Sequence, residues 1–218
     1  MPELDITQYQ TLVFDCDGVL LNSNKIKSQA FYKATKHFGH ESAQAFVDYH
    51  MQNGGISRYA KVKYFIKEIL KQEFDETLYQ DLLARFARAV KDGLMACDIA
   101  EGLSELKTKT KSTWFVVSGG DQNELREVFS ARDLEKYFDG GIFGSPDSKD
   151  IILAREISAH NITNPALFLG DSKYDYQAAS LANIDFVFLH QWTEVDDWEV
   201  FCKTNGLKSV SSLKDFVV

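Results

Sequence analysis

Cysteine and proline are scarce in this sequence, since each occurs three times in 218 residues. The cysteines, Cys16, Cys97 and Cys202, are odd in number and far apart. They therefore predict neither a disulfide framework nor a zinc motif, and they favour a reducing, cytoplasmic setting. So few prolines leave no proline-rich linker. Composition alone therefore marks no boundary between domains.

The sequence also lacks long apolar runs and an excess of basic residues. No run approaches the ~18 apolar residues of a membrane-spanning helix, and the acidic segment Met1–Asp5 has neither region of a signal peptide. With 24 basic and 32 acidic residues the net charge is −8, which argues against nucleic acid as the main partner. A hydrophobic content of 44% excludes disorder as the main state. We expect a soluble, globular protein that binds neither membrane nor nucleic acid.

Short apolar runs alternate with helical patterns through much of the chain. Residues 11–14 (Thr-Leu-Val-Phe) predict a buried strand, as do residues 114–117, 141–143, 166–169 and 185–189. Helical patterns follow the middle three of these runs. Alternating strands and helices imply a parallel sheet with right-handed crossovers. The expected fold class is therefore α/β, with a Rossmann-like, three-layer parallel sheet core.

Residues 25–94 contain no convincing strand. Apolar residues recur there at helical spacing in four stretches, of which Leu78–Val90 is followed by a glycine, Gly93. Four amphipathic helices in one block indicate a helical subdomain inserted after the first strand. We expect residues 1–20 and 95–218 to form the α/β core domain and residues 21–94 to form an α-helical cap.

Polar residues follow the predicted strands at the ends where ligands bind in an open α/β sheet. In chain order they are Asp15, Asp17, Ser118, Gly119, Gly120, Lys149 and Asp171. Clustered carboxylates repel one another unless a cation neutralises them, and oxygen ligands favour Mg²⁺. The serine, the glycine amides and the lysine suit a small anion. A metal beside an anion site indicates phosphoryl transfer, in which one carboxylate attacks phosphorus and a second acid protonates the leaving oxygen.

These residues fall in four motifs that resemble those of the haloacid dehalogenase-like superfamily, in its phosphatase branch with a helical cap. Phe14–Leu20 is similar to motif one and Val117–Gly120 to motif two. Lys149 is similar to motif three and Gly170–Asp175 to motif four. All four stand in the family's order, each after a predicted strand, and together they span nearly the whole chain. One departure is Asn22-Ser23, where the family often has Asp-Ser.

The resemblance implies a role for each matched position in the first two motifs. Asp15 is expected to be the nucleophile and a Mg²⁺ ligand. Asp17 is expected to be the general acid and base, with its backbone carbonyl on the metal. Ser118 and Gly119 are expected to bind the phosphoryl group.

The last two motifs complete the implied site. Lys149 is expected to hold both the phosphoryl oxygens and Asp15, Asp171 to ligate the metal, and Asp175 to support the site. The implied function is Mg²⁺-dependent hydrolysis of a small phosphorylated metabolite through an aspartyl phosphate. A sugar phosphate or a phosphorylated hydroxy or keto acid is the expected substrate.

The helical block offers the loop Asn53–Arg58, in which two glycines make a tight turn whose backbone is able to approach a ligand. By resemblance to the cap loops of related phosphatases and mutases, Arg58 is expected to contact an anionic group of the substrate. His50 and Lys61 are expected to be surface or packing residues. Cys16 lies between two site aspartates, and strand alternation points it away, so we expect a small buried residue.

Several other functions are compatible with parts of this pattern. A sugar phosphomutase of the β-phosphoglucomutase type shares every motif and stays open. A dehalogenase needs no leaving-group acid, so Asp17 argues against it. A phosphonate-cleaving enzyme needs a cap lysine for a Schiff base, and the matching loop has Arg58 instead. The intact set of site residues argues against a non-catalytic binding or regulatory protein on the same fold. Whether the protein is a monomer or a dimer stays undecided.

Overall fold

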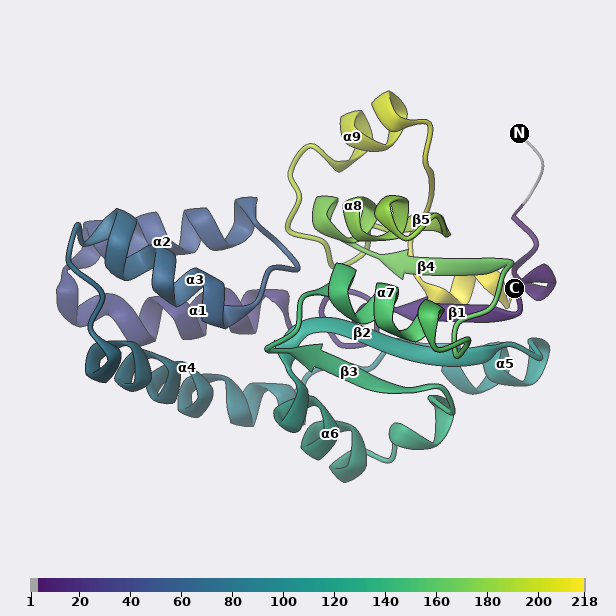
Figure 1. Ribbon diagram of the computed structural model, residues 1–218, viewed down its shortest axis with the longest axis horizontal. Helices are drawn as coiled ribbons and strands as arrows, with labels where there is room; N and C mark the ends of the chain where they lie inside the picture. The colour runs from purple at the N-terminus through teal and green to yellow at the C-terminus, as the bar shows by residue number, and fades with distance from the viewer. Residues whose placement is uncertain (1–3, 218) are drawn as a thin grey trace.

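A parallel sheet forms the centre of the computed structural model, which describes residues 4–217 (Figure 1). Its strands are β1 Thr11–Phe14, β2 Thr113–Asp121, β3 Gly141–Ser145, β4 Ala166–Gly170, β5 Asp185–Leu189 and β6 Lys208–Val210. Within the described residues they lie in the order β3-β2-β1-β4-β5-β6, and each neighbouring pair is parallel. β1 therefore lies between β2 and β4, and the carboxyl ends of these three strands adjoin one another.

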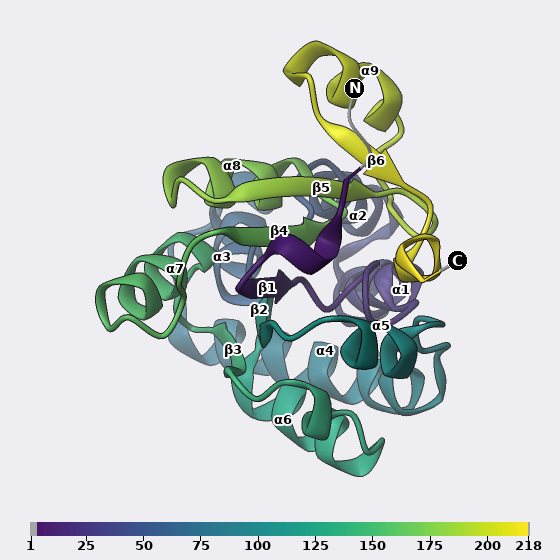
Figure 2. The same cartoon turned by 90° about the vertical axis from the view of Figure 1, so that its right-hand side faces the viewer.

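Alternate residues of the strands face two separate hydrophobic clusters. Leu12 and Phe14 of β1 belong to the cluster that includes α5 (Leu103–Lys109) and α6 (Gln122–Ala131). Val13 belongs to the cluster that includes α7 (Lys149–Ser158) and α8 (Lys173–Leu181). Figure 2 shows α5 and α7 on opposite sides of β1. Coverage of both faces explains the continuous apolar strands, and the predicted α/β, three-layer fold is confirmed.

The sequence prediction ended the sheet at residues 185–189, and this was wrong. Helix α9 (Trp198–Asn205) and strand β6 follow. β6 has three residues and is partly exposed, so it carries no apolar run to reveal it. Helix α5 was also not predicted. In addition, β2 continues to Asp121, so Ser118, Gly119 and Gly120 lie within the strand instead of following it.

The four helices between β1 and α5 lie together at one end of the sheet (Figure 1). They are α1 Asn24–Thr35, α2 His40–Gln52, α3 Arg58–Tyr64 and α4 Glu76–Ala96, and a π-helical turn at Phe65–Ile69 extends α3. Short 3-10 turns occur at Ile6–Gln8, Lys36–Phe38, Glu135–Tyr137 and Leu213–Phe216. Phe31 holds the bundle together, since its ring centroid lies 4.9 Å from that of Phe46 and 4.2 Å from that of Phe86. Nowhere in residues 4–217 is a helix long and apolar enough to cross a lipid bilayer.

Candidate active site

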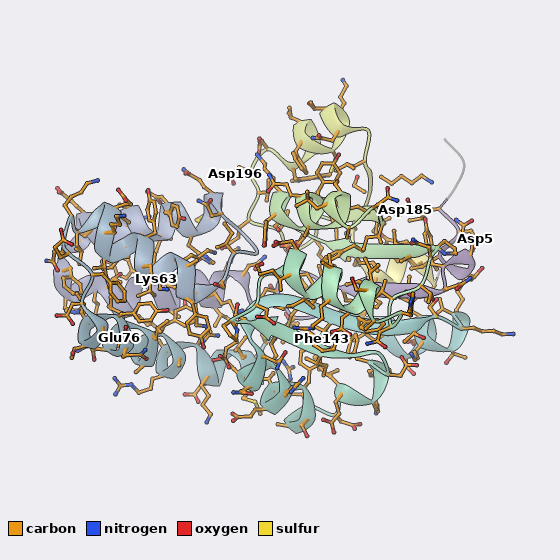
Figure 3. The ribbon with its side chains drawn as sticks, in the orientation of Figure 1. Asp5, Lys63, Glu76, Phe143, Asp185 and Asp196 are labelled. Carbon is orange, nitrogen blue, oxygen red and sulfur yellow. The ribbon has the colours of Figure 1, made fainter. Side chains whose placement is uncertain are left out.

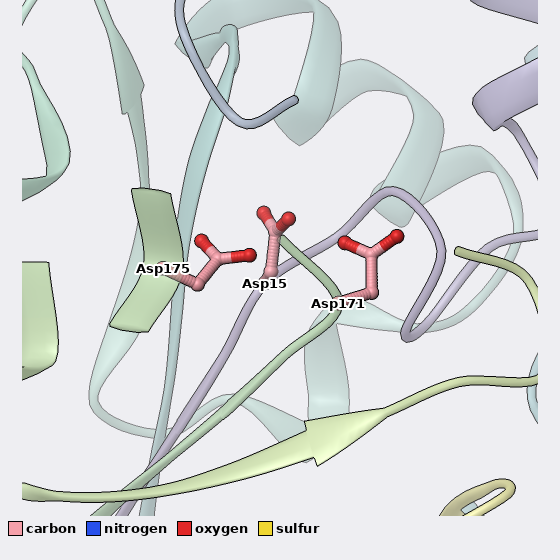
Figure 4. Close-up of side chains that lie close together, drawn as sticks. All are labelled: Asp15, Asp171 and Asp175. Carbon is pink, nitrogen blue, oxygen red and sulfur yellow. The ribbon is translucent and has the colours of Figure 1, made fainter. Parts of the chain in front are cut away.

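Three aspartates form one buried cluster beyond the carboxyl ends of β1 and β4 (Figure 4). Asp15 follows β1, Asp171 follows β4, and Asp175 lies in the first turn of α8. One oxygen of each carboxylate lies within 4.8 Å of the others. Burial raises the pKa of Asp15 to about 7 and the pKa of Asp171 well above its ordinary value, and neighbouring carboxylates add to both shifts. This concentration of buried negative charge favours a bound cation.

The three carboxylates differ in how many of their oxygens are already engaged. Asp175 accepts hydrogen bonds from Lys149 at Oδ1 and from the amide and hydroxyl of Ser172 at Oδ2, at 3.1 and 2.7 Å. Asp171 accepts one from Asn24 at 2.7 Å. Among the described residues, Asp15 Oδ1 has no hydrogen-bond partner. An all-oxygen donor set, in which Asp15 Oδ1 makes an ion pair but no hydrogen bond, fits a hard divalent cation held by Asp15 and Asp171, with Asp175 as a supporting residue.

Gly18 lets motif one approach Asp171 closely. Its φ of +77° lies in the left-handed region, and a Cβ at this position would come within 2.1 Å of Asp171 Oδ2 and 2.5 Å of Asn24 Nδ2. Glycine is therefore required here on two grounds, conformation and space. Helix α1, which begins at Asn24, is thereby tied directly to the acidic cluster.

Lys149 compensates part of the charge of this cluster. It is 0% exposed, and its Nζ lies 2.8 Å from Asp15 Oδ1 and in contact with Asp175 Oδ1. The contact with Asp15 is an ion pair whose geometry is not that of a hydrogen bond. Burial opposes the charge of Lys149, but the two aspartates outweigh it and raise the pKa of Lys149 above its ordinary value. The lysine is therefore a fixed positive charge beside Asp15.

Asp17 is held by two residues of the segment that follows motif one. Its Oδ1 accepts a hydrogen bond from Ser23 at 2.6 Å, and its Oδ2 pairs with Lys27 of α1. Burial opposes ionisation of Asp17, but Lys27 and the two hydrogen bonds together lower its pKa. In this arrangement Asp17 is held as an ionised carboxylate. Ser23 thus keeps a site contact even though the preceding position, Asn22, departs from the family pattern.

The end of β2 meets the loop before α3. Ser118 is fully buried, and its hydroxyl accepts a hydrogen bond from the Gly120 amide at 3.0 Å. A Cβ on Gly119 would lie 2.1 Å from the carbonyl oxygen of Gly55. Two backbone segments far apart in the sequence are therefore in direct contact, and the loop predicted to approach a ligand lies over the strand end.

A small cavity of about 50 Å³ lies between the sheet end and α1–α3. Of the residues singled out in the sequence, its lining includes Asp15, Asp17, Arg58, Gly119 and Asp171. Ser118, Lys149 and Asp175 lie outside this lining, and the last two contact Asp15 and each other. Cys16 is buried, as expected, and does not line the cavity.

Arg58 faces the cavity but is already paired. Its guanidinium makes two hydrogen bonds to the carboxylate of Glu124 on α6, and it lies 4.6 Å from the ring centroid of Phe86. Next to it, Tyr59 donates a hydrogen bond to Asp121 at 2.5 Å. Both contacts join α3 to the sheet core, so Arg58 has a structural partner besides any ligand.

Three residues of the cavity wall, Lys27, His50 and Lys61, were not predicted as site residues. His50 and Lys61 are buried, which agrees with the packing alternative, but both also line the cavity. Each lies on an amphipathic helix, where a lysine or histidine normally marks the solvent face. The sequence offered one weak signal for Lys61. It lies in the first turn of α3, shortly after the loop glycines Gly54 and Gly55 that were predicted to approach a ligand. Lys61 also removes the ground on which phosphonate cleavage was set aside, since a lysine of the helical bundle lines the same cavity as Asp15.

Comparison with known proteins agrees with this architecture. Residues 12–189 match the haloacid dehalogenase-like hydrolase family. A phosphorylated carbohydrates phosphatase of Thermotoga maritima is 23% identical over 190 residues, which cover 82% of this chain and 84% of the relative. A predicted phosphatase from Clostridium acetobutylicum has a similar structure, with a TM-score of 0.72, 20% identity and 95% of each chain covered.

A second solved structure gives the same fold. A predicted phosphoglycolate phosphatase from Haemophilus somnus matches with a TM-score of 0.66 and 20% identity, over 84% of this chain and 86% of that one. The four motifs, the parallel sheet and the acidic cluster at its carboxyl edge agree with the family match, which covers most of the chain. This protein belongs to the haloacid dehalogenase-like hydrolase family.

Proposed function

We propose that the protein is a Mg²⁺-dependent phosphomonoester hydrolase of a small phosphorylated metabolite, acting through an aspartyl phosphate. The observation that carries this proposal is Asp15, a buried carboxylate of the acidic cluster with one oxygen free of hydrogen bonds, paired with the cation Lys149. The phosphorylated carbohydrates phosphatase among the relatives supports a sugar phosphate as substrate. A phosphorylated hydroxy or keto acid is the other class we propose.

The proposed reaction has two displacements at phosphorus. An oxygen of Asp15 attacks, the ester P–O bond breaks, and the leaving oxygen takes a proton from Asp17. Water then attacks the phosphorus of the aspartyl phosphate and gives a proton to Asp17. The bond between phosphorus and Asp15 breaks, which releases inorganic phosphate and restores Asp15. The contacts of Asp17 with Ser23 and Lys27 suit the second displacement. The first requires that the Lys27 contact be broken, because an adjacent ammonium keeps the carboxylate ionised.

Asp15, Asp171 and the backbone carbonyl of Asp17 are the proposed ligands of Mg²⁺. When bound, the cation offsets negative charge on the carboxylates and on the transferring phosphoryl group. Asp175 is a supporting residue in this proposal because both of its oxygens already have partners. Ser118, the amide of Gly119 and Lys149 are the proposed partners of the phosphoryl oxygens, and the Gly120 amide positions the Ser118 hydroxyl.

Addition of Mg²⁺ should stabilise the protein more at pH 8 than at pH 5. The folded-state pKa of Asp15 is raised from 3.8 to about 7, so the stability that this group contributes to the metal-free protein is lost as pH rises through about 7. Mg²⁺ competes with protons for the carboxylate. At a hundred times its dissociation constant, we expect a Tm increase of about 5–10 °C at pH 8 and less than half of that at pH 5. Thermal unfolding with Mg²⁺ or with NaCl of equal ionic strength measures this, and equal increases at both pH values would contradict it.

Residues 21–94 are proposed to act as a cap that closes over the site, with residues 1–20 and 95–218 as the core domain. The contacts of Gly55 with Gly119, of Arg58 with Glu124 and of Tyr59 with Asp121 support a closed arrangement. The small cavity volume favours metabolites over phosphoproteins, and closure would exclude bulk water from the aspartyl phosphate.

Gly119→Ala should lower kcat/KM by about tenfold or more, because the new methyl group displaces the cap loop and small misplacements are costly in catalysis. Steady-state phosphate release from wild type and variant measures the effect, and thermal unfolding of both is the control for a folding defect. A Gly119→Ala enzyme as active as wild type would show that the loop contact is not needed for turnover.

The direct test is phosphate release from a panel of sugar phosphates and small phosphorylated acids, with Mg²⁺ and with chelator. Mg²⁺-dependent release supports the hydrolase. Isomerisation of a sugar phosphate that depends on a bisphosphate, with little free phosphate, would replace it with the phosphomutase that shares all four motifs. No turnover of any member by folded protein would favour a non-catalytic binding protein.

Lys61 makes phosphonate cleavage a second candidate. Burial lowers the pKa of Lys61 to about 7, with a further contribution from Lys27, and a partly neutral amine in a cavity is able to form a Schiff base with a carbonyl substrate. Borohydride should trap such a substrate on Lys61 if this function is correct. Absence of trapping by an otherwise active enzyme leaves the phosphomonoester hydrolase.

A further inference from the structure

Three cationic side chains of the helical bundle line the cavity, and two of them have carboxylate partners. Lys27 pairs with Asp17, and Arg58 pairs with Glu124. The third, Lys61, has no carboxylate oxygen within 4.0 Å among residues 4–217. A buried ammonium without a counter-ion is costly. Lys61 nevertheless lines the same cavity as Asp15, the proposed nucleophile.

Lys61 is fixed in place by His50 of α2. Its Nζ lies 2.6 Å from His50 Nδ1 and donates to the His50 carbonyl oxygen at 3.4 Å. Burial lowers the pKa of Lys61 to about 7, and an anion bound beside it favours the ammonium form. In that form Lys61 only donates hydrogen bonds, so Nδ1 acts as the acceptor and the ring proton is carried by Nε2. Burial, followed by the charges of Lys61 and Lys27, keeps the pKa of His50 well below its ordinary value, which agrees with a neutral ring.

The other ring nitrogen of His50 is a buried donor without a partner. Within the described part of the chain, Nε2 makes no hydrogen bond, although the residue is 8% exposed and lines the same cavity. An unsatisfied buried donor is costly, as is an uncompensated charge. Lys61 and His50 therefore present positive charge and an unused N–H group in one place, and both are satisfied by a single negatively charged oxygen group.

Asp17 and Glu194 are the candidates for an internal counter-ion, since both line the cavity and their charges act on Lys61. Asp17 is already paired with Lys27. The two oxygens of Glu194 accept hydrogen bonds from Ser28 at 3.1 and 2.9 Å, and Glu194 makes no ion pair with Lys61. Arg58 is less available to a ligand than Lys61, because its guanidinium is held at two points by Glu124. The free positive charge of the cavity is therefore at Lys61.

We propose that Lys61 and His50 form a second anion site, which selects phosphomonoesters carrying another negatively charged group, such as a carboxylate, on the leaving portion. This inference rests on the proposed function, because it assigns the phosphoryl group of the same molecule to Lys149, Ser118 and the Gly119 amide. It places specificity on α2 and α3 and gives Arg58 mainly the role of joining α3 to α6.

Binding of matched phosphonates tests the site without relying on turnover. The probes are phosphonoacetate, 3-phosphonopropionate and 4-phosphonobutyrate, each paired with the alkylphosphonate of equal chain length, and calorimetry with Mg²⁺ gives the Kd values. In wild type, the carboxylated member of at least one pair should bind about 10- to 100-fold more tightly, as expected for a charge-assisted hydrogen bond. In Lys61→Met this preference should fall below about twofold, while affinity for inorganic phosphate stays unchanged.

Three further variants separate selection from structure. Lys61→Arg should retain much of the preference, and His50→Phe should reduce it by removing Nε2–H while keeping a ring against Phe31. Lys63→Met is the matched control, since Lys63 is on the same helix and exposed (Figure 3), and should change nothing. The proposal would be overturned if Lys61→Met lost affinity equally for both members of every phosphonate pair. It would also be overturned if wild type showed no preference for the carboxylated member of any pair.

The phosphate-release panel distinguishes failure of the anion-site proposal from failure of the proposed function. Hydrolysis without any preference for carboxylated phosphonates would exclude the second anion site and leave the proposed function intact. Preference for the carboxylated probes without hydrolysis would retain the anion site and remove the hydrolase. Failure to bind any phosphonate or to hydrolyse any ester would contradict both.

Discussion

Asp15→Asn should lower the rate of phosphate release by about a thousandfold or more, because an amide does not replace the carboxylate as nucleophile. The substitution conserves shape, and Lys149 keeps Asp175 as a partner. We therefore expect the free energy of unfolding to change by no more than about 1 kcal/mol. Steady-state assays with the best substrate of the panel, and urea unfolding of the same preparation, measure the two quantities separately.

Asp185→Asn is the control for this experiment. Asp185 opens β5, at the opposite end of the sheet from the acidic cluster, and is exposed (Figure 3). Its replacement should leave turnover unchanged, because the amide oxygen is still an acceptor for the Tyr9 hydroxyl and only the charge is lost. Turnover by Asp15→Asn at more than about a tenth of the wild-type rate would exclude an aspartyl phosphate at this position.

The sheet was largely predictable because most of its strands are buried on both faces. Residues 11–14, 114–117 and 166–169 are continuous apolar runs, and all of them lie in strands of the structure. β6 was missed for the opposite reason, since Lys208–Val210 is short and partly exposed at the sheet edge. Strand prediction from a sequence thus succeeds where burial dominates and fails where a strand is short and only partly buried.

The positions of the motif residues were predictable because topology places the ends of parallel strands at one edge. Asp15 and Asp171 come together for that reason. Lys27 and Lys61 were not predictable, because a lysine on an amphipathic helix normally lies in solvent and nothing local distinguishes these two. Their burial depends on the packing of the helical bundle over the sheet, which only the tertiary structure reveals.

Lys149→Met should be strongly destabilising as well as inactive. The lysine is 0% exposed and compensates two buried carboxylates, Asp15 and Asp175. Its removal leaves both charges unpaired, for which we expect a loss of about 3–5 kcal/mol in the free energy of unfolding at pH 8 without Mg²⁺. Turnover should fall by about 100-fold or more, because a fixed positive charge is lost beside the transferring phosphoryl group.

The pH dependence of this loss identifies its cause. Lys149 opposes the upward shift in the pKa of Asp15, so in Lys149→Met that pKa should rise further, and protonation at pH 5 should remove much of the repulsion. The loss in the free energy of unfolding, measured with urea, should therefore be smaller at pH 5 than at pH 8.

A double variant tests the same cause in another way. In Lys149→Met with Asp15→Asn, removal of one buried charge should recover part of the stability and none of the activity. Lys67→Met, at an exposed position, is the control. A deficit that is equal at both pH values and unrelieved in the double variant would show that Lys149 stabilises the protein by packing and not by its charge.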